Sequence, residues 1–364
     1  MEPVVLPGMP DRNTGGDLVR IAIVGGGLAG AMLAWRLTRP PNRIHTELFV
    51  GAGRDRVDAT GASGGLVRGF EADPELSADA ADSLAELVAS PMLRSWARFR
   101  EVGSVFAVRP GGDPGPSLAV VEATLPGSAR LCGPLDLPSV HPLRRLADAV
   151  ICVVEPRAGY LSPQALRNAA LRQSVGDGAV IRPDTVRTVT AVPTVALGDG
   201  TTLHFDAVVL AAGPWTPAIL VRSGLPAVEL RTGQIQYVVR HVRLPGVGAF
   251  VEESSGLYGR SAEPAGFLLG LPCERADADP DTVCADAELT VRVLERATEI
   301  LGPRPTGGPP DRVVTAVDCY TDPPGLRLRS VQPRSGLYTF SGGSGRSAKT
   351  VLAASRAAAA LLAC

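Results

Sequence analysis

Lysine is almost absent from this sequence. Of its 36 lysine and arginine residues, only Lys349 is a lysine, and it stands directly after the glycine-rich stretch SGGSGRSA. A general preference for arginine accounts for the other basic residues but not for this exception. Because a compact ammonium group forms interactions that a planar guanidinium does not, Lys349 is a candidate functional residue.

Excess charge and cysteine pairs are also missing. With a formal net charge of −1, the chain has no basic excess that would favour nucleic acid or an anionic membrane. No apolar run approaches the roughly 18 residues of a membrane span. The six cysteines include no C-x-x-C pair, so neither a zinc site nor a disulfide framework is predicted. These absences favour a reduced, cytoplasmic protein without a metal site.

The first residues have little that could fold. Residues 1–18 combine proline, glycine and acidic residues and lack the apolar segment of a signal peptide. We therefore predict a disordered tail. The remainder of the 364 residues is long enough for two or three domains, and 45% hydrophobic residues can fill their cores.

The strongest local motif follows this tail. Residues 21–24 form a short apolar run typical of a buried strand, and Leu28–Thr38 has the pattern of a helix. Between them, Gly25, Gly27 and Gly30 have the spacing G-x-G-x-x-G. The first glycine permits a tight turn, the second lets the backbone approach a pyrophosphate, and the third lets the helix pack closely on the strand. This context favours dinucleotide binding over a purely structural turn.

A second strand is expected over residues 43–50. Dinucleotide sites usually place an acidic residue at the end of this strand, where it binds the adenosine ribose. Gly51 stands there and Glu47 falls inside the strand, so the ribose partner stays open. The small-residue stretch 60–71 leads to Arg68, and it is either a surface loop or a backbone lying against a flat cofactor.

The later segments predict a mixed α/β protein. An alternating pattern between residues 228 and 271 is typical of an antiparallel sheet. A second buried strand runs from residue 206 into Gly213-Pro214, and the chain closes with a glycine turn before an alanine-rich helix. Further helices are expected over residues 77–90, 91–102 and 284–301.

Three separated stretches together are similar to one family: IAIVGGGLAGAMLAWRL, DAVVLAAGPWTP and GGSGRSAKTVLAAS. They resemble the D-amino-acid oxidase superfamily of FAD enzymes, and within it the monomeric sarcosine oxidase and glycine oxidase branch, over nearly the whole chain after residue 18. The resemblance implies an α/β fold in which a Rossmann-like FAD-binding domain is interleaved with an antiparallel-sheet substrate domain. We expect the FAD-binding domain over residues 19–85, 150–224 and 312–364, and the substrate domain over residues 86–149 and 225–311.

The resemblance also implies which residues contact the FAD. They are Gly25, Gly27, Leu28, Ala29, Gly30, Ser63, Gly64, Val186, Ala212, Gly213, Pro214, Cys319, Gly342, Gly343, Ser344, Gly345 and Lys349. Cys319 falls within about one residue of the cysteine that bonds covalently to the flavin in sarcosine oxidases. A covalent link and an inert buried thiol both stay open for it.

Three residues resemble those that bind or orient the substrate. Arg68 and Lys349 resemble the pair that holds the substrate carboxylate, and a guanidinium fork with an ammonium suits that group well. A surface ion pair is the alternative for Arg68. Tyr258 resembles a tyrosine of the substrate sheet, where plain packing is the alternative. Leu268 stands where sarcosine oxidases have the lysine that promotes reaction with oxygen, which puts fast turnover with oxygen in doubt.

The expected function is FAD-dependent oxidation of the C–N bond of an amino acid or related carboxylated amine, secondary or cyclic amines included. Hydride transfer to the flavin would give an imine, and oxygen or another acceptor would reoxidise the flavin. The alternatives are a flavin monooxygenase that needs NAD(P)H, an NAD-dependent dehydrogenase, and a flavoprotein that binds a carboxylated ligand without turnover. We expect a small-molecule substrate and a monomer or small homo-oligomer.

Overall fold

The computed structural model describes residues 19–51, 58–138, 141–146, 150–226, 229–242, 244, 246–262, 266–302 and 307–364. The tail predicted for residues 1–18 lies outside them. The chain divides into two compact units. The first unit contains residues 1–61, 163–232 and 318–364, and the second contains residues 62–162 and 233–317.

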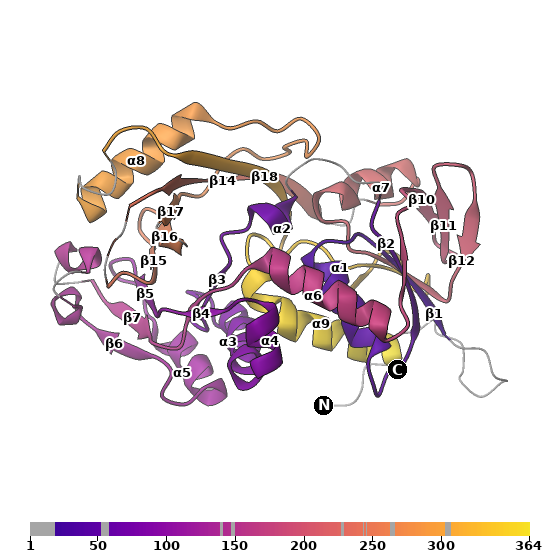
Figure 1. Cartoon of the computed structure of the whole chain (residues 1–364), viewed down its shortest axis with the longest axis horizontal. Helices are drawn as coiled ribbons and strands as arrows, with labels where there is room; N and C mark the ends of the chain where they lie inside the picture. The colour runs from indigo at the N-terminus through magenta and orange to yellow at the C-terminus, as the bar shows by residue number, and fades with distance from the viewer. Residues whose placement is uncertain are drawn as a thin grey trace. The chain divides into compact units, whose positions relative to one another are not determined.

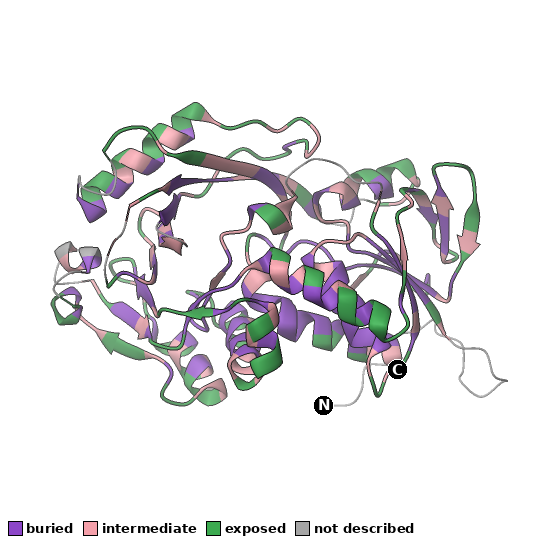
Figure 2. Ribbon diagram, in the orientation of Figure 1, coloured by how far each residue is buried: buried purple, intermediate pink, exposed green. Residues whose placement is uncertain are grey.

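A six-stranded sheet forms the centre of the first unit. Its strands lie in the order β19-β20-β13-β1-β2-β9, and all neighbours are parallel except β19 and β20. The bounds are β1 Arg20–Val24, β2 His45–Phe49, β9 Val180–Arg182, β13 Ala207–Leu210, β19 Arg329–Ser330 and β20 Leu337–Thr339. Parallel strands are usually covered on both faces, and the continuous apolar runs of β1 and β13 are buried accordingly (Figure 2).

Helix α1, Leu28–Thr38, packs on β1 and β2 of this sheet. The helices α6 Pro163–Gly176 and α9 Ser347–Ala363 both contact α1 (Figure 1). The buried Arg36 of α1 donates to the Leu352 carbonyl of α9 at 3.3 Å. The same unit contains the antiparallel sheet β10 Val186–Thr190, β11 Thr194–Leu197 and β12 Thr202–His204, and the helix α7 Thr216–Arg222.

An eight-stranded sheet organises the second unit, in the order β18-β14-β17-β16-β15-β5-β7-β6. Its bounds are β5 Ser104–Ala107, β6 Arg130–Cys132, β7 Cys152–Glu155, β14 Leu230–Arg240, β15 Ala249–Glu252, β16 Leu257–Ala262, β17 Gly266–Gly270 and β18 Arg312–Thr321. One face packs under α8, Ala287–Leu301. Leu289, Val293, Ala297 and Ile300 form the buried stripe of that helix, as their spacing predicts (Figure 2).

The shorter elements complete the second unit. They are β3 Leu66–Val67, α3 Pro74–Ala89, α4 Pro91–Trp96, β4 Arg100–Glu101, α5 Gly115–Thr124, β8 Gly159–Tyr160 and two 3-10 turns, Pro134–Asp136 and Pro142–Arg145. The short helix α2, Ala59–Ala62, includes the last residues of the first segment of the first unit and Ala62 of the second unit. The helix predicted over residues 91–102 is wrong beyond Trp96. Arg98 has a φ of +47°, which an α-helix does not allow, and Arg100 pairs with Tyr160 of β8. Tertiary pairing therefore overrides the local apolar stripe, while the predicted mixed α/β class is confirmed.

Candidate functional site

Two glycines of the first motif are required by the packing of the protein itself. Gly25 has a φ of +122°, and a Cβ there would lie 2.4 Å from the Ala211 carbonyl oxygen. A Cβ on Gly30 would lie 2.0 Å from the carbonyl oxygen of Gly25. The tight turn between β1 and α1 therefore has no space for side chains at either position.

Gly27 is different, because the protein leaves room beside it. Its φ of −70° is ordinary, and the nearest atom to an added Cβ would be the Thr60 hydroxyl oxygen at 3.4 Å. The helix α1 begins here without a side-chain cap and without an acidic residue in its first turn. An anion is stabilised at such a positive helix end, so the residues present fit a pyrophosphate.

The structure adds Thr60 to this turn. Its hydroxyl accepts a hydrogen bond from the backbone N–H of Leu28 at 3.0 Å. The sequence analysis treats Thr60 only as the start of a small-residue stretch, because nothing local shows that a residue so far along the chain reaches the glycine motif.

The three sequence motifs meet at one edge of the parallel sheet. Strands β1, β13 and β20 are neighbours, so the glycine turn, the segment Ala212-Gly213-Pro214 and the closing glycine turn all follow carboxyl ends of adjacent strands. The Ser341 hydroxyl lies 2.9 Å from that of Thr216, which ties the second and third motifs together. Ligands of open α/β sheets bind at this kind of edge.

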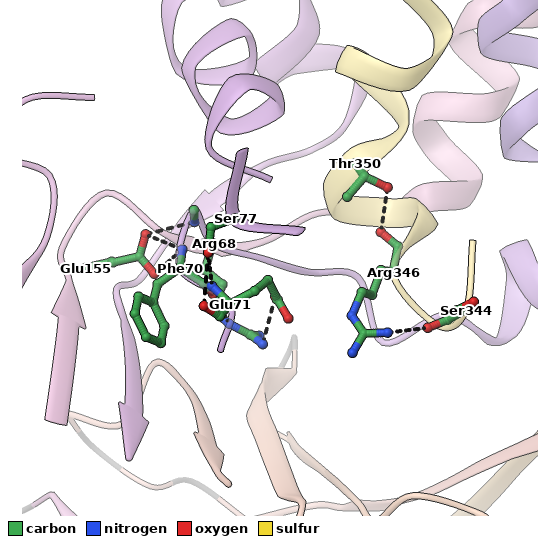
Figure 3. A network of polar contacts seen from close by, with 9 residues as sticks. Arg68, Phe70, Glu71, Ser77, Glu155, Ser344, Arg346 and Thr350 are labelled. Atoms are coloured by element: carbon green, nitrogen blue, oxygen red, sulfur yellow. Dashed lines mark hydrogen bonds and ion pairs between the residues drawn. The ribbon is translucent and has the colours of Figure 1, made fainter. Parts of the chain in front are cut away.

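The closing turn is held by the end of β18. The Ser344 N–H donates to the Cys319 carbonyl at 3.0 Å, and the Gly345 N–H donates to a carboxylate oxygen of Asp318 at 2.8 Å. Arg346 donates to the Ser344 carbonyl at 3.1 Å (Figure 3). Lys349 follows in the first turn of α9 and is 7% exposed. The lone lysine is thus a buried residue of the first unit.

Cys319 and Asp318 lie on opposite faces of β18. The Cys319 side chain belongs to the hydrophobic core of the first unit, and burial together with the charge of Asp318 raises its pKa to about 12. Both residues contact the closing glycine turn: the Asp318 carboxylate accepts the Gly345 N–H, and the Cys319 thiol lies beside the backbone N–H of Gly342. Burial raises the pKa of Asp318, although the N–H groups of Cys319 and Gly345 oppose this.

Glu47 is held inside the sheet by two arginines. Arg20 of β1 donates to it at 2.8 Å and Arg182 of β9 at 2.5 Å. Val186, the first residue of β10, is buried in the hydrophobic core that also contains Cys319. The hydroxyl oxygen of the preceding residue, Thr185, would lie 3.8 Å from a Cβ added to Gly51 at the end of β2. The Glu47 carboxylate is therefore engaged in ion pairs rather than presented at the end of the strand.

The predicted residues of the second unit include Ser63, Gly64 and Arg68. Arg68 is buried and forms an ion pair with Glu71 at 2.9 Å, and its Nε donates to the Phe70 carbonyl (Figure 3). Its guanidinium also lies 5.2 Å from the centre of the Phe106 ring. Glu155 accepts the N–H of Gly69 at 2.7 Å. The positive charge of Arg68 is thus compensated within its own unit.

Tyr258 lies on the sheet face opposite α8. Its ring fills the space beside Gly270, where an added Cβ would lie 2.3 Å from the tyrosine hydroxyl. Leu268 shares this face and is 1% exposed. Arg260 pairs directly with Leu268 across β16 and β17, so a cation that the sequence analysis does not identify stands opposite the leucine.

In the part of the chain that the structure describes, no group of His, Cys, Asp and Glu side chains could hold a metal ion. Among the same residues, no helix is both long enough and apolar enough to cross a membrane.

The parallel sheet, with glycine-containing turns at the carboxyl ends of β1, β13 and β20, is the architecture of an α/β protein that binds a dinucleotide. The family model of FAD-dependent oxidoreductases matches residues 20–361, and the chain belongs to this family. The predicted resemblance to the D-amino-acid oxidase superfamily, the enzymatic function as an oxidoreductase and FAD as the cofactor are thereby confirmed.

Solved structures extend the likeness over the whole fold. L-proline dehydrogenase from P. horikoshii is 15% identical, with a TM-score of 0.79, and covers 96% of this chain and 94% of its own. Iminodiacetate oxidase from Chelativorans sp. BNC1 is 20% identical, with a TM-score of 0.73, and the match covers 94% of this chain and 95% of that protein. Glycine oxidase from Geobacillus kaustophilus is 19% identical, with a TM-score of 0.72, and the match covers 95% of this chain and 94% of that protein. A search of curated protein sequences found no match.

Proposed function

We propose that this protein oxidises the C–N bond of an amino acid or related carboxylated amine. The observation that carries the proposal is the position of the buried Lys349, in the first turn of α9 and directly after the closing glycine turn of the FAD-binding unit. An ammonium at this position has three N–H donors, and a charge-assisted hydrogen bond from one of them can bind a substrate carboxylate and fix its orientation.

The residues of the chain bind and orient the substrate and the FAD, and the FAD is the oxidant. The chemistry that bound FAD supplies is a two-electron oxidation, in which carbon loses a hydride, nitrogen loses a proton and the amine becomes an imine. Lys349 holds the carboxylate so that the C–H bond keeps one orientation, which lowers the entropic part of the barrier. Gly27 and the start of α1 hold the pyrophosphate.

Arg68 is the proposed second residue that binds the substrate carboxylate, although it is already paired with an acidic residue. Its ion pair with Glu71 already compensates its charge, so a substrate carboxylate would share the guanidinium with that residue. A guanidinium has five N–H donors, and the contacts to Glu71 and to the Phe70 carbonyl leave donors for a second carboxylate. Lys349 is therefore the principal anchor and Arg68 the minor one.

The position of Cys319 supports FAD bound without a covalent link. Its thiol packs in the hydrophobic core and has a pKa of about 12, so the reactive thiolate is suppressed. All six cysteines are free, which supports placement in the reducing cytoplasm. Acid precipitation of the native protein should release the flavin into the supernatant. Flavin that stays with the precipitate, and is freed by Cys319→Ser, would contradict this.

The neighbouring structures suggest the substrates for the test. Those proteins are named for L-proline, glycine and iminodiacetate. We expect one or more of a panel of amino acids, N-alkyl glycines and cyclic imino acids to bleach the flavin absorbance anaerobically without NAD(P)H. A protein bleached only by NAD(P)H would instead be a monooxygenase, and one bleached by neither would be a binding protein.

A further inference from the structure

Two cysteines face each other in the eight-stranded sheet of the second unit. Cys132 is the last residue of β6 and Cys152 is the first residue of β7, and these strands are neighbours (Figure 1). The antiparallel register places the two cysteines directly opposite one another. Both side chains contact the hydrophobic core under α8, so they lie on the same face of the sheet. Because Cβ atoms of directly opposite residues are about 4.5–5.5 Å apart, the two thiols are neighbours in the folded protein.

The remaining cysteines stand elsewhere in the chain. Cys273 follows β17, and β16, β15 and β5 lie between that strand and β7, which corresponds to about 19 Å along the sheet. Cys319 belongs to the core of the first unit, and the other two are exposed. The strand register therefore distinguishes Cys132 and Cys152 as a pair, although their spacing in the sequence does not.

The two thiols differ in their access to solvent. Cys152 is 0% exposed, and burial together with the charge of Cys132 raises its pKa to about 11. Cys132 is half-buried. Burial raises its pKa as well, Arg130 opposes this rise and Asp136 adds to it. Since the thiolate is the reactive form of cysteine, Cys132 is the thiol that a small oxidant reaches, and its reaction becomes faster as the pH rises toward the raised pKa.

Little movement is needed to join the two sulfur atoms. A disulfide requires Cβ atoms about 3.5–4.5 Å apart, which is roughly 1 Å less than the usual separation of opposite residues. The strand β6 lies at the end of the strand order, next to β7. Because Cys132 is the last residue of this edge strand, its backbone can approach Cys152 without disturbing the pairing of β7 with β5.

We propose that Cys132 and Cys152 form an oxidative modification site, at which hydrogen peroxide converts the two thiols into a disulfide that joins β6 to β7. In the first step the Cys132 sulfur attacks one peroxide oxygen, the O–O bond breaks, and a sulfenic acid and one water form. In the second step the Cys152 sulfur attacks the Cys132 sulfur, the S–O bond breaks, and a second water leaves. In sum, two thiols lose two hydrogen atoms and one peroxide becomes two waters.

This modification is reversible and does not depend on the proposed function. A dithiol cleaves the bond by thiol–disulfide exchange, so the free cysteines of the structure are the reduced form of the same site. The disulfide closes a loop of the chain and thereby restricts its unfolded state. The oxidised protein should therefore unfold at a higher urea concentration than the reduced protein.

Mass spectrometry of the FAD-loaded full-length protein tests the site. After treatment with hydrogen peroxide, the free thiols are blocked with iodoacetamide and the protein is digested with trypsin. Cleavage after arginine places the two cysteines in separate peptides, residues 131–144 and 146–157. These peptides should be recovered joined, about 2 Da lighter than their sum because two hydrogen atoms are lost, and dithiothreitol should separate them. The rate of joining should rise about tenfold from pH 7 to pH 8, as the thiolate fraction of Cys132 does.

Three variants assign the roles of the two thiols. In Cys152→Ala the sulfenic acid of Cys132 lacks its reaction partner, so dimedone, which labels sulfenic acids, should label Cys132. In Cys132→Ser the buried Cys152 should be oxidised at least about 10-fold more slowly than in wild type. The matched control Cys284→Ser removes an exposed thiol and should leave the rate of joining unchanged. Since Cys132 is half-buried, its variant tests the site even if replacement of the core residue Cys152 prevents folding.

The outcomes decide the proposal one by one. Joined peptides with the expected pH dependence support it. Oxidation of Cys132 to a sulfinic acid without joining would overturn the disulfide, and a joined pair that contains Cys273 would overturn the pairing. Oxidation of Cys152 at the wild-type rate in Cys132→Ser would overturn the order of the two steps. None of these measurements requires amine oxidation, so failure of the proposed function would leave their result unchanged.

Discussion

At the scale of single residues, glycines of the same motif have different tasks. A Cβ on Gly25 would lie 2.4 Å from the Ala211 carbonyl oxygen, and a Cβ on Gly30 would lie 2.0 Å from the Gly25 carbonyl oxygen. Neither position therefore has space for a side chain. Gly27 has an ordinary backbone conformation and space for a methyl group. The packing of the protein therefore does not explain why this position lacks a side chain, whereas the proposed pyrophosphate contact does.

This difference predicts opposite effects of two alanine substitutions. Gly27→Ala should fold with a stability within about 1 kcal/mol of wild type but retain much less FAD, because its methyl group enters the space for the pyrophosphate. Gly25→Ala should lose at least about 2 kcal/mol, since strain and a backbone clash act together. Circular dichroism, urea unfolding without added FAD and the ratio of flavin to protein distinguish them. Full flavin content in Gly27→Ala would remove the phosphate role.

At the scale of elements, Glu47 connects three neighbouring strands through ion pairs. It lies on β2 between Arg20 on β1 and Arg182 on β9, and its own side chain is 3% exposed. Burial alone would raise the pKa of Glu47, but the hydrogen bonds and charges of the two arginines outweigh it and lower the pKa below its ordinary value of 4.5. The ionised carboxylate therefore stabilises the folded state.

The sign of this shift predicts a pH-dependent effect. The contribution of Glu47 should be fully present above pH 4.5 and lost as the pH falls through the lower, folded pKa. Glu47→Gln should reduce the free energy of unfolding by about 1–3 kcal/mol at pH 7, and its difference from wild type should shrink in acid. Glu299→Gln, which breaks an exposed pair on α8, should cost less than about 1 kcal/mol. A loss of stability in Glu47→Gln that is the same in acid as at pH 7 would contradict the ion-pair explanation.

Elements differ in how well the sequence predicts them. Leu28–Thr38 is a helix with the predicted bounds, because a glycine turn begins it and Pro40-Pro41 follow it. The helix expected through residue 102 ends at Trp96, since the strand pairing of Arg100 with Tyr160 decides that segment. Local patterns determine an element only where no distant partner competes for its backbone.

At the scale of the whole molecule, the same distinction separates the predictable site residues from the others. The three glycine-containing motifs of the first unit were found from sequence, because each is local and parallel pairing brings their ends together. Thr60, Asp318 and Arg260 were missed. Each becomes relevant only through a partner distant in sequence or through its strand face: the N–H of Leu28, the N–H of Gly345 and the strand position of Leu268.

The role of the lone lysine connects the composition of the chain to its chemistry. Removing one partner from a buried charge pair typically costs about 2–5 kcal/mol, or about 30- to several thousand-fold in binding. Lys349→Met should therefore weaken amine-driven flavin reduction to that extent while FAD stays bound. Arg68→Met should have a smaller effect on reduction, because Glu71 already compensates that arginine, and it should lower stability by leaving Glu71 buried without its ion pair.

Stopped-flow measurement of the two half-reactions decides between the possible roles of Lys349. Weak reduction with normal reoxidation supports the carboxylate anchor. Normal reduction with slow reoxidation would instead assign the ammonium to the reaction with oxygen, since the apolar Leu268 provides no charge for it, and the substrate would then depend on arginine alone. A variant equal to wild type in both half-reactions would show that this buried ammonium serves only the packing of α9.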